Sequence, residues 1–217
     1  MHSYLISIQV GKPKEIDKSN DPWTTAFFKE PVDHQIWLNK TNLEGDQQAD
    51  LVNHGGEDKA VLAYSDNHYS KWIRELKLTS LPFGAFGENF TIFGLDEKDV
   101  CIGDVYVISE DVIVQVSQPR RPCWKISRRW DIKDLTKKVT DSLRTGWYFR
   151  VLKEGYVIKD SSVRLIERPH PNLTVQLANE VMHKRKNDPD LLNELAECPS
   201  LSRSWQKDYK KLLQNDA

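Results

Sequence analysis

One cysteine of this chain lies among positive charges in a loop that prolines stiffen. The segment 118–125 reads Gln-Pro-Arg-Arg-Pro-Cys-Trp-Lys and places Cys123 near Arg120, Arg121 and Lys125. Positive charges favour the thiolate, which is both the nucleophilic form of cysteine and a soft ligand for soft metals. The loop therefore suits covalent chemistry or metal binding. The alternative is an inert cysteine, because burial in apolar surroundings raises the pKa of a thiol.

The other two cysteines have different surroundings. Cys101 lies in the apolar stretch 99–103, and Cys198 precedes Pro199 at the end of an expected helix. The three cysteines are far apart and form neither a CxxC pair nor a cluster with histidine, which argues against a disulfide framework and a zinc site. We therefore expect Cys101 and Cys198 to be structural.

A second polar segment, 50–59, contains His54, Gly55 and Gly56 and ends at Lys59, just before an expected strand. Glycine allows the backbone to approach a ligand closely, and exposed amides in such a turn can hold an anion. Lys59 would add positive charge and His54 would add a hydrogen bond. The alternative is an ordinary loop with a hydrogen-bonded histidine.

Two further segments combine glycines with polar side chains. In 83–90, Asn89 follows Glu88 and offers both a donor and an acceptor, although this segment could equally be a turn between strands. The segment 145–150 begins another strand, and its Arg150 could bind a phosphate with two hydrogen bonds. A surface salt bridge is the ordinary alternative for this arginine.

Motifs and charge argue against several common classes of protein. The sequence contains no Walker loop, no GxGxxG after a strand, no HExxH and no GxSxG. The 31 Lys and Arg against 32 Asp and Glu leave a net charge of -1, which does not attract nucleic acid or an acidic membrane. Apolar stretches stay well below the roughly 20 residues that cross a bilayer, and residues 1–6 lack the features of a secretory signal. We expect a cytoplasmic protein with a small or neutral partner.

The elements that must position these residues are mainly strands up to about residue 167. Short apolar runs are broken by Gly, Pro, Asn and Asp, which is typical of strands joined by turns. The clearest runs are 5–10, 59–64, 105–108 and 112–116. They predict a compact, β-rich body.

Two helices interrupt this body. Apolar residues at 69, 72, 73 and 76 recur with helical spacing after Ser65 or Asp66, either of which could cap the helix. Apolar residues at 132, 135, 139 and 143 predict a second helix that stops before Gly146. Both apolar stripes are interpreted as core-facing.

From residue 172 onward the pattern becomes helical. Apolar residues at 173, 177 and 181 mark one helix, and Asp188 before Pro189 predicts the cap of a second, which Pro199 ends. A third helix has its apolar face at 201, 205, 209 and 212. We expect three short helices to pack on one another around Trp205.

Four blocks together resemble a known family. They are 45–50 leading into 54–56, then 84–89, then 119–124, then 146–150. In this order they resemble the MOSC family, named for the C-terminal domain of molybdenum cofactor sulfurases, and specifically its small bacterial hydroxylaminopurine-resistance type. The resemblance covers nearly the whole chain, because proteins of this type also have a three-helix extension. One departure is at Lys159 and Asp160, where a Gly-Asp turn is expected.

The resemblance implies an α+β, mainly β fold, with a MOSC-type β-barrel at 1–168 and a three-helix domain at 172–217. It implies that Cys123 ligates molybdenum or carries sulfur, so that Cys123 is both the expected catalytic residue and the metal ligand. The pterin of a molybdenum cofactor carries a phosphate, for which the implied partners are cationic or polar side chains. The cofactor-binding residues expected in this way are His54, Lys59, Glu88, Asn89, Arg120 and Arg150.

The leading hypothesis is a molybdenum-dependent reductase that detoxifies N-hydroxylated bases or similar small N-oxygenated compounds, with electrons from a redox partner protein. On this hypothesis Arg120 and Lys59 bind the phosphate, and His54, Glu88 and Asn89 orient the pterin or the substrate. One alternative is a carrier that delivers the cofactor, or sulfur on Cys123, without turnover. Another is an interaction protein whose helical tail recruits a partner. Pyridoxal phosphate is sometimes associated with this family, but no lysine here stands out as a Schiff-base candidate.

Overall fold

The computed structural model describes residues 2–17, 21–185 and 188–215. A mixed sheet of eight strands forms the centre of the fold, in the order β12-β8-β9-β10-β6-β7-β1-β4, and β6 and β7 are its parallel pair. Two small antiparallel sheets pair β11 with β5 and β2 with β3. The strands are β1 (Tyr4–Val10), β2 (Lys14–Ile16), β3 (Trp23–Thr25), β4 (Glu30–Pro31), β5 (Ile36–Leu38), β6 (Val61–Ser65), β7 (Phe90–Phe93), β8 (Val105–Ile108), β9 (Val112–Pro119), β10 (Trp147–Lys153), β11 (Gly155–Val157) and β12 (Val163–Glu167).

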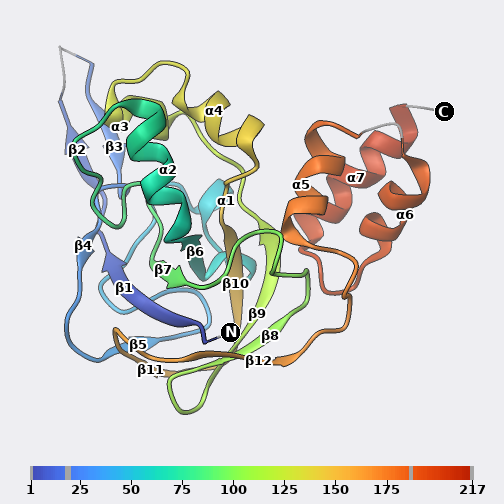
Figure 1. The fold of residues 1–217 in the computed structure, drawn as a ribbon, viewed down its shortest axis with the longest axis horizontal. Coiled ribbons are helices and arrows are strands. Elements are labelled where there is room, and N and C mark those ends of the chain that lie inside the picture. Colours follow the sequence, from blue (N-terminus) through green and yellow to red (C-terminus); the bar gives the residue numbers. More distant parts are fainter. Residues whose placement is uncertain (1, 18–20, 186–187, 216–217) are drawn as a thin grey trace.

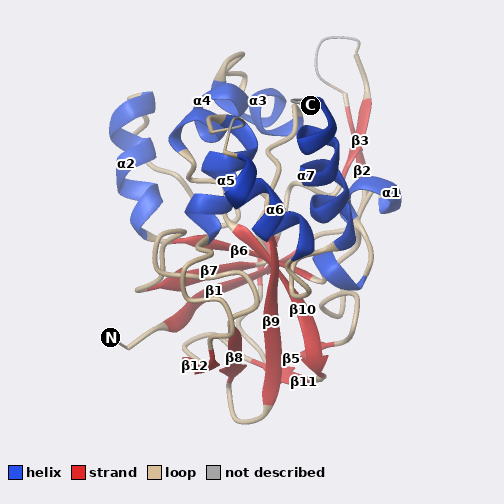
Figure 2. Cartoon of the chain, turned by 90° about the vertical axis from the view of Figure 1, so that its right-hand side faces the viewer, coloured by secondary structure: helices blue, strands red, loops and turns tan. Residues whose placement is uncertain are grey.

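The central sheet curls into a half-barrel. Register shifts interrupt the pairing of β10 with β9, β12 with β8 and β1 with β7, and such irregularities bend and twist a sheet. The concave side buries large side chains, including Tyr106, Trp147 and Phe149, each at most 1% exposed. The helices gather beyond one end of the strands (Figure 2). The predicted α+β, mainly β fold is confirmed.

The predicted strands are confirmed with shifted ends. β1 and β8 lie where the apolar runs placed them, and β9 continues to Pro119, directly before the loop that carries Cys123. The expected strand at 59–64 begins later, at Val61, because Glu57–Lys59 form a 3-10 turn, η1, that keeps Lys59 out of the sheet.

The helices of the body correct one prediction. α2 (Asn67–Leu76) matches the first apolar stripe and has Asp66 at its N-cap position, although no side-chain hydrogen bond caps it. The second stripe forms α4 (Leu135–Ser142), which begins later than Ile132 because residues 131–134 form a turn. The short α3 (Lys125–Trp130), which a left-handed Asp131 ends, was not predicted. A left-handed Leu143 ends α4, before Gly146 as expected.

Three tail helices pack against the sheet and one another: α5 (Val175–His183), α6 (Pro189–Glu197) and α7 (Arg203–Asn215) (Figure 1). The Asp188 side chain accepts a hydrogen bond from the Leu191 amide, and Pro189 begins α6, as predicted. Trp205 and Tyr209 are buried in a core that continues without interruption from the half-barrel into the tail. No helix in the described part of the chain is long and apolar enough to span a membrane.

Cys101 and Cys198 are both buried. Burial raises the pKa of both thiols, so both stay protonated and unreactive near neutral pH. Asp160, at the departure from the expected Gly-Asp turn, adopts the left-handed backbone conformation that Gly103 adopts in the corresponding turn.

Candidate cofactor site

The loop after β9 and the segment around α1 (Leu51–His54) meet at one cavity. Its volume is about 560 Å³, including the part open to solvent, and residues 25–27, Lys29 and residues 46–49 form more of its wall. Five residues expected from the sequence line it, namely His54, Lys59, Asn89, Arg120 and Cys123. Segments far apart in the sequence therefore meet around a single thiol.

Hydrogen bonds fix the loop that carries Cys123. The Arg120 amide donates to the Gly146 carbonyl (3.0 Å), which extends the pairing of β9 with β10. The Cys123 carbonyl accepts hydrogen bonds from the Ile126 amide and the Thr136 hydroxyl, both at 3.1 Å. Cys123 is half-buried and not disulfide-bonded, so its thiol is held in the cavity wall.

Arg120 is the most deeply buried cation at the cavity. Only 4% of the residue is exposed, and its buried Nη1 has no hydrogen-bond partner in the part of the chain that the structure describes. The ring of Phe27 lies 5.8 Å from the guanidinium carbon. A buried charge without a partner is costly, so this guanidinium is prepared for an anionic ligand.

The short helix α1 positions His54 and Lys59. The Asp50 side chain caps α1 by accepting a hydrogen bond from the Asn53 amide (3.0 Å), and His54 ends the helix. The Lys59 ammonium donates to the Asn53 carbonyl (2.7 Å). This bond ties η1 to α1 and holds both side chains at the cavity.

The cavity has excess positive charge. Burial, followed by repulsion from Arg120 and Lys125, lowers the pKa of His54 from 6.5 to about 4, so this imidazole is neutral at neutral pH. Burial and repulsion from Arg121 also lower the pKa of Lys59. An anion in the cavity would relieve both effects.

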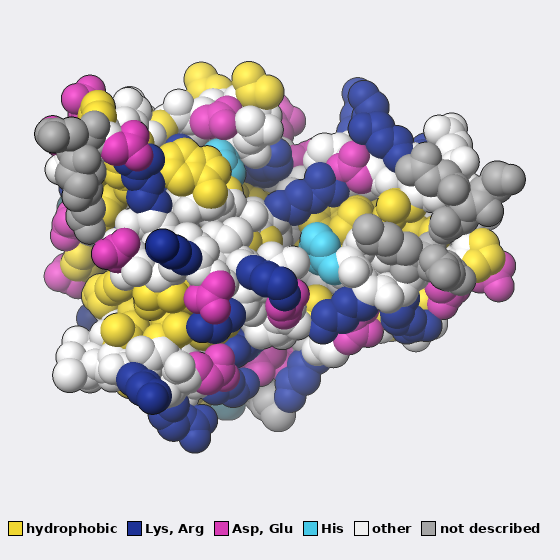
Figure 3. All heavy atoms as spheres, turned by 90° about the horizontal axis from the view of Figure 1, so that it is seen from above, with side chains coloured by type: hydrophobic (Ala, Val, Ile, Leu, Met, Phe, Trp, Pro, Cys, Tyr) yellow, Lys and Arg dark blue, Asp and Glu magenta, His cyan; other side chains and the backbone are white. Residues whose placement is uncertain are grey.

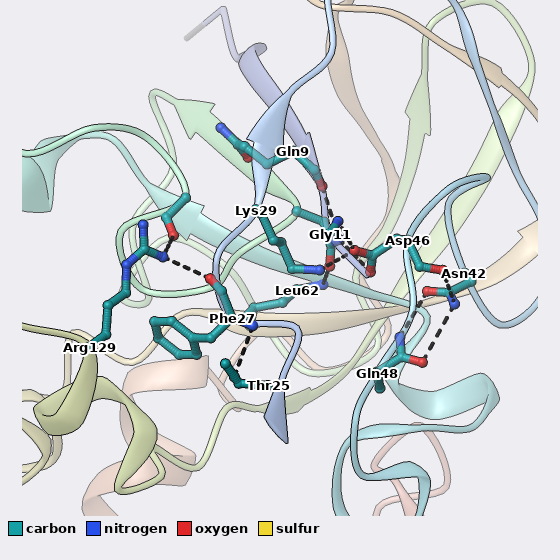
Figure 4. A network of polar contacts seen from close by, with 12 residues as sticks. Gln9, Gly11, Thr25, Phe27, Lys29, Asn42, Asp46, Gln48, Leu62 and Arg129 are labelled. Carbon is teal, nitrogen blue, oxygen red and sulfur yellow. Dashed lines mark hydrogen bonds and ion pairs between the residues drawn. The ribbon is translucent and has the colours of Figure 1, made fainter. Parts of the chain in front are cut away.

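A buried network that the sequence did not reveal forms another wall of the cavity. The Lys29 ammonium donates to Asp46, whose carboxylate also accepts hydrogen bonds from the Gly11 amide (2.7 Å) and the Asn89 side chain (2.9 Å) (Figure 4). Burial lowers the pKa of Lys29, and Asp46 opposes that shift. Asp46 belongs to the 45–50 block, but no sequence pattern marked Lys29.

Asn89 is held rigidly where it lines the cavity. Its side-chain nitrogen also donates to the Gln9 carbonyl (3.2 Å), and its oxygen accepts from the Leu62 amide (3.2 Å). Through these bonds, Asn89 connects the Lys29–Asp46 ion pair to the sheet.

Glu88 does not line the cavity. It is fully buried, and its carboxylate accepts hydrogen bonds from the amides of Gly84 (2.8 Å) and Phe86 (3.1 Å) and from the Tyr69 hydroxyl. These bonds close the glycine-containing turn at 84–88, which corresponds to the alternative interpretation of that segment.

Arg150 also lies outside the cavity. Its guanidinium forms an ion pair with Asp58 (2.7 Å) and donates to the Gln115 side chain (3.1 Å). This is the salt-bridge alternative, and the pairing of β10 with β9 sets Arg150 opposite Gln115.

The cavity residues suit a metal ion that is already bound to an organic anion. The described residues contain no group of three or more His, Cys, Asp or Glu able to hold a metal ion. The cavity instead offers one thiol together with Arg120, Lys59 and Lys125. A metal held here would take most of its ligands from the molecule that carries it, and the cations would bind that molecule's phosphate.

The fold and the cavity define a class: an α+β protein whose curled sheet presents one thiol among several cations. The MOSC domain matches residues 50–164, and the YiiM-like, 3-alpha helix domain matches residues 173–216. The chain therefore belongs to the MOSC domain family, in the form that carries the YiiM-like helical extension.

Similar proteins agree with this family. The chain is 41% identical to YflK of Bacillus subtilis (strain 168) over 208 residues, which are 95% of this chain and 93% of that protein. It is 36% identical over 199 residues, 91% of its length, to a protein of Gibberella moniliformis (strain M3125 / FGSC 7600) named a reductase, of which it covers 35%. The crystal structure of YiiM from Geobacillus stearothermophilus superposes with a TM-score of 0.82 at 34% identity, covering 97% of this chain and 99% of that one.

Proposed function

We propose that the chain binds a molybdenum cofactor through Cys123 and reduces small N-hydroxylated compounds. The observation that carries the proposal is that the half-buried Cys123 thiol meets, at one cavity, the buried Arg120 guanidinium, whose Nη1 has no hydrogen-bond partner among the described residues. A ligand that satisfies both groups needs a soft metal and an anion in the same molecule. The family to which the chain belongs is associated with molybdenum cofactor, which has both.

Each cavity residue has a proposed role in holding this ligand. Cys123 would ligate the metal, while Arg120, Lys59 and Lys125 would bind the phosphate. Neutral His54 and the braced Asn89 would orient the pterin or the substrate. When bound, the cofactor supplies a metal centre that transfers electrons in pairs. Glu88 and Arg150 have structural partners and take no part in this proposal.

Reducing a hydroxylamino group consumes protons that the protein must deliver. The N–O bond breaks as R-NHOH takes up two electrons and two protons and gives R-NH2 and water. The Lys29 ammonium lines the cavity and has donors beyond the one used by Asp46. We assign Lys29 to protonating the departing oxygen, with Asp46 holding the ammonium in place.

The electrons would come from a redox partner protein. The fungal relative that bears the name reductase is much longer than this chain, which covers 35% of it. For this chain we propose that a separate protein supplies the electrons. Three free cysteines suit a reducing compartment, so we propose that the protein acts in the cytoplasm.

A reductase assay tests the proposal. The protein is produced with molybdenum cofactor, and reduction of a hydroxylaminopurine by a chemical electron donor is followed. Wild type should turn over, and Cys123→Ser should lose at least 100-fold in kcat, whereas Cys198→Ser, at a buried cysteine that does not line the cavity, should retain activity per folded molecule. Cofactor-loaded wild type that reduces no N-hydroxylated compound would overturn the reductase assignment and leave a carrier.

A further inference from the structure

A second cavity lies between α2, residues 96–98, residues 142–144 and α5. Its volume is about 800 Å³, including the part open to solvent, and it shares no lining residue with the cavity of Cys123. Of the described residues that line it, only Leu143 is apolar. A wall of this kind suits a small, charged ligand, because it offers hydrogen bonds and charge but little apolar surface.

Two carboxylates in this wall already have partners within the protein. Glu75 forms an ion pair with Arg144 (2.6 Å). Asp96 accepts hydrogen bonds from the Ser65 hydroxyl and from the Asn67 side chain (3.2 Å). These contacts neutralise or satisfy both carboxylates, so neither is free to attract a cationic ligand.

Glu97, the third carboxylate, joins the second cavity to the loop of the first. Glu97 is only 4% exposed, its Oε2 lies 2.6 Å from His68 Nε2, and its Oε1 accepts a hydrogen bond from the Gly146 amide (2.7 Å). The Gly146 carbonyl in turn accepts a hydrogen bond from the Arg120 amide (3.0 Å). One series of hydrogen bonds therefore connects His68, at the second cavity, with Arg120, at the first.

The cations of the second cavity, in contrast to its carboxylates, are largely unpaired. Lys71 and Lys98 form no ion pair or side-chain hydrogen bond within the described part of the chain. Nη1 of Arg144 and Nδ1 of His68 are buried and have no hydrogen-bond partner there either. Surface composition does not reveal this difference, because Lys and Arg lie among Asp and Glu on the face seen from above (Figure 3).

We propose that the second cavity binds a small oxyanion of the size of sulfate or phosphate, and that its occupancy strengthens anion binding at Arg120. Lys71, Lys98 and Arg144 supply the positive charge for this ligand. A bound anion holds residues 142–146 in the position that also fixes the Arg120 amide, so binding at each cavity favours binding at the other. The inference needs only an anion at Arg120, whatever molecule carries it.

A sulfate titration of the full chain at constant ionic strength, followed by NMR of the imidazoles, tests the proposal. His68 reports on the second cavity and His54 on the first. Replacing both Lys71 and Lys98 by Ala should weaken sulfate binding at His68 roughly 2- to 30-fold, as expected for two solvent-accessible charges. The same variant should raise the sulfate concentration that half-saturates the His54 response by roughly twofold or more.

A second double variant, with both Lys133 and Lys159 replaced by Ala, is the matched control. These lysines are exposed and line neither cavity, so the net charge changes equally while both responses should stay as in wild type. A His68 signal that ignores sulfate, or that responds equally in the two double variants, would overturn the second site. A His54 response that is the same in the two double variants would overturn the coupling. A chain that binds no molybdenum would leave both sulfate responses intact, so failure of the proposed function is distinguishable.

Discussion

The cavity is lined by Arg120, His54 and Lys59, and its side chains carry more positive than negative charge. Nη1 of Arg120 has no hydrogen-bond partner among the described residues, and burial, followed by repulsion from Arg120 and Lys125, lowers the pKa of His54 to about 4. Both would change when an anion binds. At the scale of single residues, the central question is therefore whether the cavity takes up an anion.

Sulfate, which stays a dianion throughout the relevant pH range, should raise the pKa of His54 from about 4 towards 6.5. NMR of the imidazole at increasing sulfate measures this shift. Without the anion, His54 binds its proton more tightly in the unfolded chain than in the folded one. The free energy of unfolding therefore falls as the pH falls from 6.5 to about 4. Sulfate should reduce that loss of stability. Arg120→Gln should weaken the sulfate response. A pKa that saturating sulfate leaves unchanged would contradict an anion site.

Replacing only one partner of the Lys29–Asp46 ion pair should lower the free energy of unfolding. Both side chains are buried, at 7% and 0% exposure, so Lys29→Met would leave Asp46 charged without its cation. We expect a loss of about 3 kcal/mol in the free energy of unfolding, measured by urea denaturation. The double variant Lys29→Met with Asp46→Asn should recover part of that loss. A single variant as stable as the double would show that the pair is not coupled.

The sequence predicted functional side chains that lie together in one segment. It did not predict contacts that form between distant segments. The charged loop around Cys123 stood out from its sequence, and so did the glycine turn beside His54. Lys29 did not, because only folding brings it to Asp46. The ion pair of Arg150 with Asp58 likewise depends on where β10 and η1 meet.

At the scale of elements, the junction of β9, β10 and β6 sets the position of the cysteine loop. Gly146 precedes β10 with φ at +76°, and an added Cβ would lie 2.4 Å from the Ala63 carbonyl oxygen of β6. Its carbonyl accepts the Arg120 amide, and its amide donates to the buried Glu97 carboxylate (2.7 Å). Gly146 thus couples the cavity loop to the sheet.

Gly146→Ala should therefore weaken both folding and anion binding. We expect a loss of about 3 kcal/mol in the free energy of unfolding and weaker sulfate binding, since the strand junction must shift and carry Arg120 with it. Gly56→Ala is the control, because Gly56 also has a positive φ, +96°, but its Cβ would meet no atom within 4 Å. Equal losses from both substitutions would mean that backbone strain alone, and not the contact with β6, governs the junction.

Elements with long apolar patterns were predictable, and short ones were not. α2, α5 and α7 follow from the helical spacing of their apolar residues, α6 from its Asp-Pro start and the proline that ends it, and β1 and β8 from their apolar runs. α3 is six residues long with Ile126 as its one buried residue, so it has no stripe to recognise. The left-handed Asp131 that separates α3 from α4 has no unambiguous local signal, because aspartate also occurs within helices.

At the scale of the whole molecule, the helical tail supports the cavity loop as well as the sheet. The Arg121 guanidinium carbon lies 4.8 Å from the Trp205 ring, and Arg121 forms an ion pair with Asp208 (2.6 Å). The Ser202 amide donates to the Ser117 carbonyl of β9 (2.9 Å). The division into domains at 1–168 and 172–217 remains a prediction, and these contacts cross it.

We expect the full chain to unfold in one cooperative transition, because a single cluster of buried side chains runs through the half-barrel and the tail. Trp205→Ala should lower the temperature of that transition as a whole, with a loss of about 3 to 5 kcal/mol. Differential scanning calorimetry measures both. Two separate transitions, with only one of them moved by Trp205→Ala, would favour an independent tail that recruits a partner.

The most direct test of the account is the molybdenum content of wild type and Cys123→Ala, both produced anaerobically in a host that makes the cofactor. We predict near-stoichiometric molybdenum in wild type and its loss in the variant, with circular dichroism showing both chains folded. Cys198→Ala, also folded, should keep the metal. Folded wild type without molybdenum, or a Cys123→Ala variant that keeps it, would contradict the assignment of Cys123 as the ligand.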